Sequence, residues 1–182
     1  MPSIVAGMPR TLILMRHGQA TSPAGTADHE RPLTPTGAAQ AEAAGRWFAA
    51  DGRRIDTVLC SSALRTRETF RGVSRGARWR DADSACTSSP ALYNADATAV
   101  LGEIALASAS TTTLLVIGHF PGLPEAALVL DPAGAHSGRV RRGMPVGAYV
   151  TMSTDSPWAA LPDALWGPAA DPFATITGIH MP

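Results

Sequence analysis

The sequence predicts an α/β protein in which several strands end at one active edge of a sheet. Short apolar runs recur along the chain, and each stops abruptly at polar residues or at glycine. A continuous apolar run of this length is typical of a strand covered on both faces. A segment with helical features follows each run, and this repetition favours a parallel sheet with packed helices. The runs span residues 11–15, 55–60 and 113–117.

Length and composition indicate one globular domain. The 182 residues can bury a proper core and leave little for a second domain. We expect this domain over residues 8–182, with residues 1–7 as a disordered N-terminal extension. Hydrophobic residues make up 45% of the chain, charged residues 16%, and the formal net charge is zero. This balance gives no sign of binding to nucleic acid or to an anionic membrane.

Local charge differs from the bulk balance. The chain has no Lys, and eight of its 15 Arg lie between Arg53 and Arg80. Guanidinium groups are planar, permanently charged donors suited to phosphate. A solvated helix face would explain most of these positions equally well.

The cysteines and the apolar runs bear on location. Cys60 and Cys86 are too few for a disulfide scaffold and lie outside a C-x-x-C spacing, so we expect reduced thiols. No run approaches the roughly 18 apolar residues of a membrane-spanning helix. The N-terminus lacks a basic segment followed by an apolar stretch and a cleavage site. The cytoplasm is therefore the expected location.

The first apolar run ends in Arg16, His17 and Gly18. Periodicity alone does not exclude a buried helix here, but the glycine breaks the pattern at once and favours a strand. In open α/β sheets, ligands bind beyond the carboxyl ends of the strands. Arg16 and His17 are therefore placed to contact a substrate. Residues 19–33 form a polar loop.

The first helix is predicted over residues 35–50. Thr34 is expected as its N-cap, and Pro35 occupies the first helical position, where its missing N–H is harmless. Gly52 is expected to cap its C-terminus.

A second unit repeats this logic. The strand at 55–60 leads to a helix predicted over 63–70, capped by Ser61 or Ser62. The N-terminal N–H groups of a helix form a ready anion site. Arg65 in its first turn opposes the helix dipole, which makes sense if an anion binds there.

The rest of the chain contains a second histidine after a predicted strand. The run at 113–117 ends in Gly118 and His119. Residues 72–90 carry no clear element, and the final segment is either a strand at 174–179 or a strap over the core. Further helices are expected at 96–109 and 121–130, a connection at 131–144 and a strand at 146–152.

Several blocks together resemble the histidine phosphatase superfamily, and especially its short SixA-type branch, the phosphohistidine phosphatases. They are RHG at 16–18, RPLTPTG at 31–37, SSALRTRET at 61–69 and GHFPGL at 118–123. The likeness covers roughly residues 11–130. It implies a three-layer sandwich with a mostly parallel central sheet, similar to phosphoglycerate mutase, without a large lid domain.

The resemblance also implies residue roles. His17 is the expected nucleophile that is transiently phosphorylated, and covalent catalysis divides one hard displacement into two easier ones. Arg16, Arg65 and His119 are expected to act with it and to bind the phosphoryl oxygens, whose charge calls for fixed cations. Gly18 and Arg31 are the further phosphate-binding residues that we expect.

The sequence departs from the family pattern at the proton donor. Larger members carry an acidic residue, typically Glu, after the third element. Here the candidates are Asp28, Glu30 and Asp96, or none of them. We favour Asp28, although it would equally pair with Arg31 as an ordinary loop carboxylate, and we expect Asp96 to cap the following helix.

A second departure lies beside His119. Phe120 stands where relatives commonly have Asn. We expect no catalytic role for His29, His136 and His180.

The expected function is a metal-independent phosphatase that removes phosphate from phosphohistidine on a protein. The alternatives are a broad-specificity small-molecule phosphomonoesterase of the same superfamily and a non-catalytic phosphate-binding module. The partner is then a phosphorylated protein or a small phosphate ester, with the oligomeric state open. No H-x-x-x-H or comparable spacing is present, so no metal or other cofactor is expected.

Overall fold

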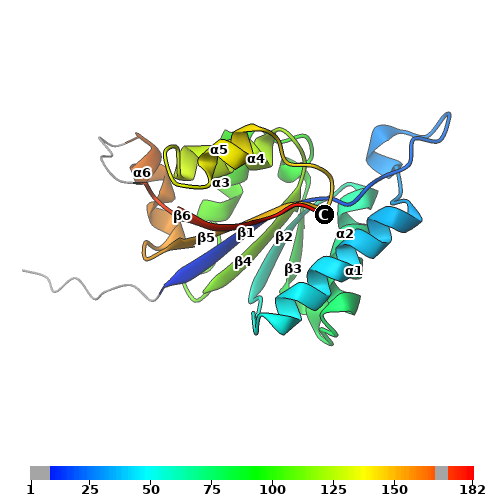
Figure 1. Cartoon of the computed structure of the whole chain (residues 1–182), viewed down its shortest axis with the longest axis horizontal. Helices are drawn as coiled ribbons and strands as arrows, with labels where there is room; N and C mark the ends of the chain where they lie inside the picture. The colour runs from blue at the N-terminus through cyan, green and yellow to red at the C-terminus, as the bar shows by residue number, and fades with distance from the viewer. Residues whose placement is uncertain (1–8, 167–171) are drawn as a thin grey trace, which may run out of the picture.

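The computed structural model describes residues 9–166 and 172–182. Its centre is a six-stranded sheet in the order β3-β2-β4-β1-β5-β6 (Figure 1). The predicted extension at residues 1–7 lies outside the described residues. The strands are β1 (Arg10–Arg16), β2 (Thr57–Ser61), β3 (Cys86–Ser89), β4 (Thr113–Gly118), β5 (Tyr149–Thr154) and β6 (Thr175–His180).

Four neighbouring strands run parallel, β5 runs against them, and β6 again runs in their direction. The pairs β3–β2, β2–β4 and β4–β1 are parallel, whereas β1–β5 and β5–β6 are antiparallel. The parallel strands therefore bring their carboxyl ends to one edge of the sheet.

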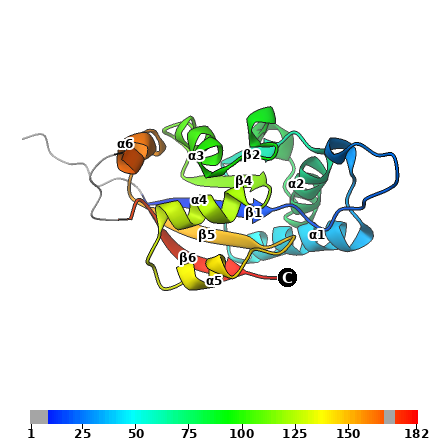
Figure 2. The same ribbon diagram turned by 90° about the horizontal axis from the view of Figure 1, so that it is seen from above.

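Helices cover both faces of the sheet (Figures 1 and 2). On one face lie α1 and α2, and on the other lie α3 and α4 with the shorter α5 and α6. The α-helices are α1 (Pro35–Ala50), α2 (Leu64–Gly76), α3 (Ala97–Ala105), α4 (Gly122–Leu130), α5 (Ser137–Arg141) and α6 (Leu161–Trp166). Short 3₁₀ helices are η1 (Asp28–Glu30), η2 (Ala82–Ala85), η3 (Pro90–Leu92) and η4 (Trp158–Ala160).

Strand β1 explains why an uninterrupted apolar run is needed. Leu12 and Leu14 pack into the core beneath α3 and α4, whereas Ile13 and Met15 pack into the core beneath α1 and α2. All four side chains are at most 1% exposed. Burying each one contributes about 1.5–3 kcal/mol, so both faces of this strand hold the layers together. The predicted α/β fold with a mostly parallel, helix-covered sheet is confirmed.

The first helix begins and ends as the sequence predicts. The Thr34 hydroxyl accepts a hydrogen bond from the Gly37 amide at 3.0 Å, and Pro35 is the first helical residue. Gly52 follows the last turn with φ of +69°, a conformation that glycine adopts without strain.

The polar stretch after α2 hides an element that the sequence analysis leaves unassigned. Within residues 72–90, α2 continues to Gly76, and Cys86–Ser89 form the edge strand β3. This strand pairs only with β2 among the described strands, and two of its four side chains are exposed. Because its residues do not need to be apolar, no apolar run announces it.

The C-terminal third shows smaller differences. The predicted connection at 131–144 contains α5, and the strand predicted at 146–152 lies at Tyr149–Thr154. Of the two alternatives for 174–179, the strand is the correct one, because β6 pairs with β5. The helix predicted at 96–109 is shorter, ending at Ala105. Among the described residues, no helix is long and apolar enough to cross a membrane.

Candidate active site

The carboxyl ends of β1 and β4 bring two histidines together. Arg16 and Gly118 are register partners in these strands, so His17 and His119 follow side by side. Their ring centroids are 5.3 Å apart. His17 is 9% exposed and His119 is 5% exposed. Residues that lie 102 positions apart in the sequence thus share one nearly buried site.

The His17 ring is held in one orientation by its own backbone. Its Nδ1 lies 2.7 Å from the Gly18 carbonyl oxygen. A carbonyl only accepts, so Nδ1 carries the proton and Nε2 keeps a free lone pair. The pKa of His17 is lowered to about 4, chiefly by burial and also by the nearby Arg65, Arg16 and Arg31, while the bond to Gly18 partly opposes this shift. The ring is therefore neutral near pH 7.

Gly18 is required by a close approach of α1. A Cβ at this position would lie 2.5 Å from the Gly37 carbonyl oxygen. The Gly18 amide donates to Thr69 Oγ1 at 3.1 Å, and the Thr69 hydroxyl in turn donates to the Arg65 carbonyl at 2.7 Å. The phosphate-binding role expected for Gly18 stays a prediction, and in this structure its amide proton is engaged by Thr69.

The His119 ring is held by a side chain. Its Nε2 lies 2.7 Å from Ser61 Oγ, and its Nδ1 lies 3.4 Å from Arg65 Nη2. The pKa of His119 is lowered to about 3, chiefly by burial and also by His17 and Arg65, while Asp28 partly opposes this shift. A guanidinium only donates, so Nδ1 of His119 is the acceptor of the Arg65 contact, and Nε2 carries the proton that is donated to the Ser61 hydroxyl.

Ser61 contacts a histidine of the site, a position that the sequence analysis does not anticipate. It predicts Ser61 or Ser62 as the cap of α2, whereas the N-cap residue is Ala63 and no side chain caps this helix. The Ser61 hydroxyl bonds His119 instead, and the Ser62 hydroxyl lies 2.9 Å from His29 Nε2. A polar residue at the carboxyl end of a buried strand is the signal that could have found Ser61.

Arg65 is buried in the first turn of α2, where the sequence analysis places it. It is 4% exposed. Its Nη1 donates to the Asp28 carbonyl at 2.6 Å, and its Nη2 lies 3.0 Å from Asp28 Oδ2. The guanidinium therefore joins η1 to His119.

The Asp28 carboxylate accepts from three side chains. Arg31 Nη1 donates to Oδ1 at 2.9 Å, while the Tyr93 hydroxyl at 2.8 Å and Arg65 share Oδ2. The bonds from Arg31, Tyr93 and Arg65 hold the pKa of Asp28 well below its usual range. Asp28 is thus ionised near neutral pH, and this arrangement favours holding Arg65 over donating a proton. No sequence signal marks Tyr93 as its partner.

The two other candidate acids have local partners. Glu30 pairs with His29 at 2.7 Å, and its side chain is 56% exposed. Asp96 accepts from the Ala99 amide at 2.8 Å and caps α3, as predicted. Neither side chain is bonded to a histidine of the site.

Arg16 contacts a different set of residues from Asp28. Its Nη1 donates to the Met144 carbonyl at 2.8 Å. Its guanidinium carbon lies 5.3 Å from the centroid of the Phe120 ring. Its Nε is buried and has no hydrogen-bond partner among the described residues. Such an orphaned donor next to His17 suits an anion.

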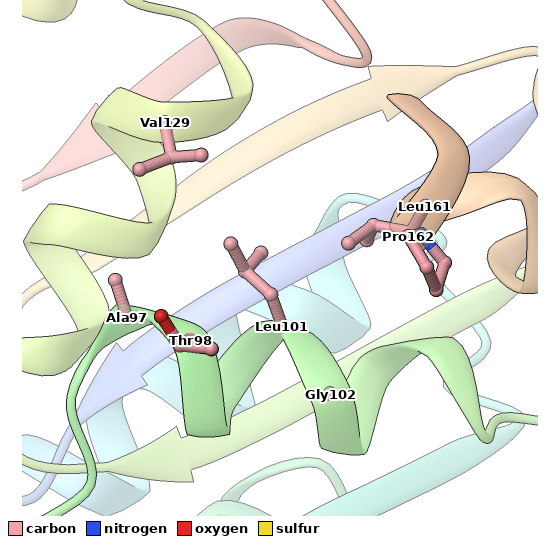
Figure 3. Close-up of a pocket in the computed structure, with 7 residues that line it drawn as sticks. All are labelled: Ala97, Thr98, Leu101, Gly102, Val129, Leu161 and Pro162. Carbon is pink, nitrogen blue, oxygen red and sulfur yellow. The ribbon is translucent and has the colours of Figure 1, made fainter. Parts of the chain in front are cut away.

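Two other features of the described residues were considered as functional sites, a metal centre and an apolar cavity. Within residues 9–166 and 172–182, no group of three His, Cys, Asp or Glu side chains could hold a metal ion. An apolar cavity of about 250 Å³ lies between α3, α4 and the start of α6 (Figure 3). No titratable side chain lines it, so it offers no catalytic group. Its lining residues are Ala97, Thr98, Leu101, Gly102, Val129, Leu161 and Pro162.

Comparison with known families and curated proteins gives consistent results. Residues 12–92 match the family model of the histidine phosphatase superfamily (branch 1). An uncharacterized protein of Mycobacterium tuberculosis is 33% identical over 176 residues, which cover 92% of this chain and 99% of the relative.

Solved structures show the same architecture. A candidate phosphohistidine phosphatase SixA from Nakamurella multipartitia has a TM-score of 0.81 and 30% identity, covering 97% of this chain and 98% of that chain. A protein histidine phosphatase SixA, solved with tungstate, has a TM-score of 0.72 and 22% identity, covering 93% and 95%. The fold is thus SixA-like.

Proposed function

Because the chain belongs to the histidine phosphatase superfamily (branch 1), we propose that it is a metal-independent phosphatase that transfers the phosphoryl group through His17. We further propose that its substrate is phosphohistidine on a protein. Similarity to a candidate phosphohistidine phosphatase supports this substrate class. The cytoplasmic location expected from the sequence belongs to the same proposal.

The observation that carries this function is the hydrogen bond from His17 Nδ1 to the Gly18 carbonyl. It supports a ring whose proton is fixed on Nδ1, so the lone pair of Nε2 is available at every pH above the lowered pKa of about 4. A neutral, oriented imidazole is the form that attacks phosphorus.

Fixed positive charge supplies the main stabilisation. Arg16 and Arg65 each offer a planar pair of donors for the oxygens of the transferring phosphoryl group. His119 adds a third donor as an imidazolium, in which Nδ1 has gained a proton. The negative charge of the phosphoryl group favours the imidazolium and would raise the pKa of His119.

The reaction proceeds in two balanced steps. The Nε2 lone pair of His17 forms a bond to phosphorus while the bond from phosphorus to the substrate nitrogen breaks and its electron pair leaves with that nitrogen. Water then attacks the phosphorylated His17, the bond from phosphorus to Nε2 breaks, and the pair returns to Nε2. Both protons of the water stay on phosphate oxygens, giving dihydrogen phosphate.

The state of Asp28 bears on the leaving group. An alkoxide leaves slowly unless an acid protonates it. An imidazole whose second nitrogen carries a proton leaves as a neutral ring and needs no acid. Since Asp28 is ionised and bonded to Arg65, Arg31 and Tyr93, the site suits a phosphoramidate better than an alkyl phosphate ester. In this proposal Asp28 positions Arg65.

Phosphoryl trapping tests the function. The protein is mixed with a radiolabelled phosphohistidine peptide and quenched within the first turnover, and the label is then examined for stability. We expect a label that is stable in alkali and lost in acid, and its absence from His17→Ala. His136→Ala serves as the control, because it removes an exposed histidine of the chain.

Other outcomes would decide against the proposal. Equal label on His17→Ala and on the wild-type protein would contradict the role of His17. Phosphate binding without label or turnover would indicate a binding module. Faster turnover of alkyl phosphate esters than of phosphohistidine peptide would favour the broad-specificity phosphomonoesterase.

A further inference from the structure

Phe120 is an exposed aromatic residue next to the site. Phe120 follows His119 directly, yet its side chain is 53% exposed, whereas His119 is 5% exposed. Single exposed apolar residues are common and need no explanation. The position of Phe120 is what matters, because its ring lies 5.3 Å from the guanidinium carbon of Arg16.

Each of the two guanidiniums at the site has an aromatic neighbour. Tyr93 lies 5.9 Å from the guanidinium carbon of Arg65, and its ring centroid lies 5.7 Å from that of His119. The Tyr93 hydroxyl is committed to Asp28. No hydrogen bond ties the Phe120 side chain, which has no polar atom, so its exposed face is free to contact a ligand.

The direction of attack places the leaving group away from His17. In a phosphoryl transfer, the attacking and leaving atoms lie roughly in line on opposite sides of phosphorus. His17 is nearly buried, so the leaving group extends toward the exposed side of the site. With the phosphoryl oxygens on Arg16, the neighbouring Phe120 ring is within reach of that leaving group.

We propose that Phe120 is a specificity-determining residue that packs against a planar, aromatic leaving group, and so selects phosphorylated imidazole over phosphorylated alkylamine. This inference rests on the proposed function. Offset packing of two rings contributes a gain that an alkyl chain does not fully match. That gain corresponds to about a two- to tenfold preference.

A pair of matched substrates tests the preference. Two peptides of the same sequence carry either phosphohistidine or N-phospholysine, so both reactions break a bond between phosphorus and nitrogen. The measurement is the ratio of kcat/KM for the two peptides. We expect Phe120→Leu to lower this ratio by about two- to tenfold, because it removes the ring and keeps the apolar bulk. Phe120→Trp should restore the ratio.

Trp47→Leu provides the matched control, since Trp47 is another partly exposed aromatic residue, 41% exposed, on α1. It should leave the ratio at the wild-type value. An equal fall for both peptides in Phe120→Leu would overturn the inference, because the ring would then only support Arg16. A wild-type protein that gains no label on His17 and hydrolyses neither peptide would overturn the proposed function and this inference with it.

Discussion

The ends of β1 and β4 carry the same side chain in two different settings. At the end of β1, a backbone carbonyl holds His17 through Nδ1. At the end of β4, the Ser61 hydroxyl holds His119 through Nε2. The carbonyl can only accept, so Nδ1 of His17 carries the proton, whereas the Arg65 guanidinium can only donate, so Nδ1 of His119 keeps a lone pair that can take up a proton. One ring is therefore suited to attack, and the other to giving and taking a proton.

This difference explains how two neighbouring imidazoles can have distinct roles. Burial lowers the pKa of both rings, so acidity alone does not distinguish them. The hydrogen-bond partner does, because it decides which nitrogen faces the substrate.

The largest expected effects on activity come from substituting each of the two histidines in turn. His17→Ala should abolish turnover and the labelled intermediate, because no other side chain is proposed to form the bond to phosphorus. His119→Ala should lower kcat by about a hundredfold to a thousandfold, as for loss of one donor to a developing charge. Single-turnover kinetics with a phosphohistidine peptide measures both. An inactive His119→Ala beside an active His17→Ala would reverse the assignment.

Arg65 connects His119 to η1, and its substitution should give the next largest effect. Arg65→Ala should lower kcat by about a hundredfold to a thousandfold and leave slow residual turnover. Asp28→Asn keeps the shape of the side chain and weakens only its bond to Arg65, so we expect kcat to fall by about tenfold. The measurement is kcat across pH 6–9 in steps of about one unit. Loss of a basic limb in Asp28→Asn would instead identify Asp28 as the proton donor.

Removing the Ser61 hydroxyl sharpens the comparison further. Ser61→Ala should lower kcat by about tenfold with little change in KM, because His119 loses the partner that orients it. Ser61→Thr retains a hydroxyl and should recover part of the rate. Ser62→Ala is the matched control, since its hydroxyl bonds His29 instead. Equal losses for Ser61→Ala and Ser62→Ala would argue against an effect transmitted through His119.

The smallest expected effect is a pH dependence of stability that follows from burying both histidine rings. Their pKa values of about 4 and 3 lie below the unfolded value of 6.5, so the unfolded chain binds more protons between those limits. Stability should therefore fall as the pH drops below 6.5, by about 1 kcal/mol for each ring at pH 5.5. Urea denaturation at pH 7.5 and 5.5 measures this loss.

A variant isolates that loss from other titrating groups. His17→Asn removes one of the two rings, so its stability should depend less on pH over the same interval. NMR titration of the wild-type histidines should place both midpoints well below 6.5. A midpoint near 6.5 for His17 would contradict burial as the dominant influence.

Local physical chemistry made much of the fold predictable. The apolar runs identify β1, β2 and β4, because a strand covered on both faces must be apolar throughout. The limits of α1 are predicted to the residue, since Thr34 and Pro35 satisfy the requirements of a helix start. Features that depend only on neighbouring residues, such as strand burial and helix capping, can be predicted from the sequence.

The edge strand and the hydrogen-bond partners were not predictable in this way. Strand β3 is half-exposed, so nothing requires its residues to be apolar. Serine is a common helix cap, so the sequence alone suggests that role for Ser61. In the folded protein its hydroxyl bonds His119 instead. Tyr93 and Asp28 are 65 residues apart, and no local pattern relates them.

The sequence by itself determined the apolar strands β1, β2 and β4, the capped start of α1 and the reactive residues expected to gather after those strands. The tertiary structure alone decided which nitrogen of each imidazole is held, which of the candidate acids is ionised and bonded, and which guanidinium lies against which aromatic ring. Burial and helix capping act within a few residues of the chain. Hydrogen-bond partners across strand ends depend on register and on side-chain direction, which exist only once the sheet has formed.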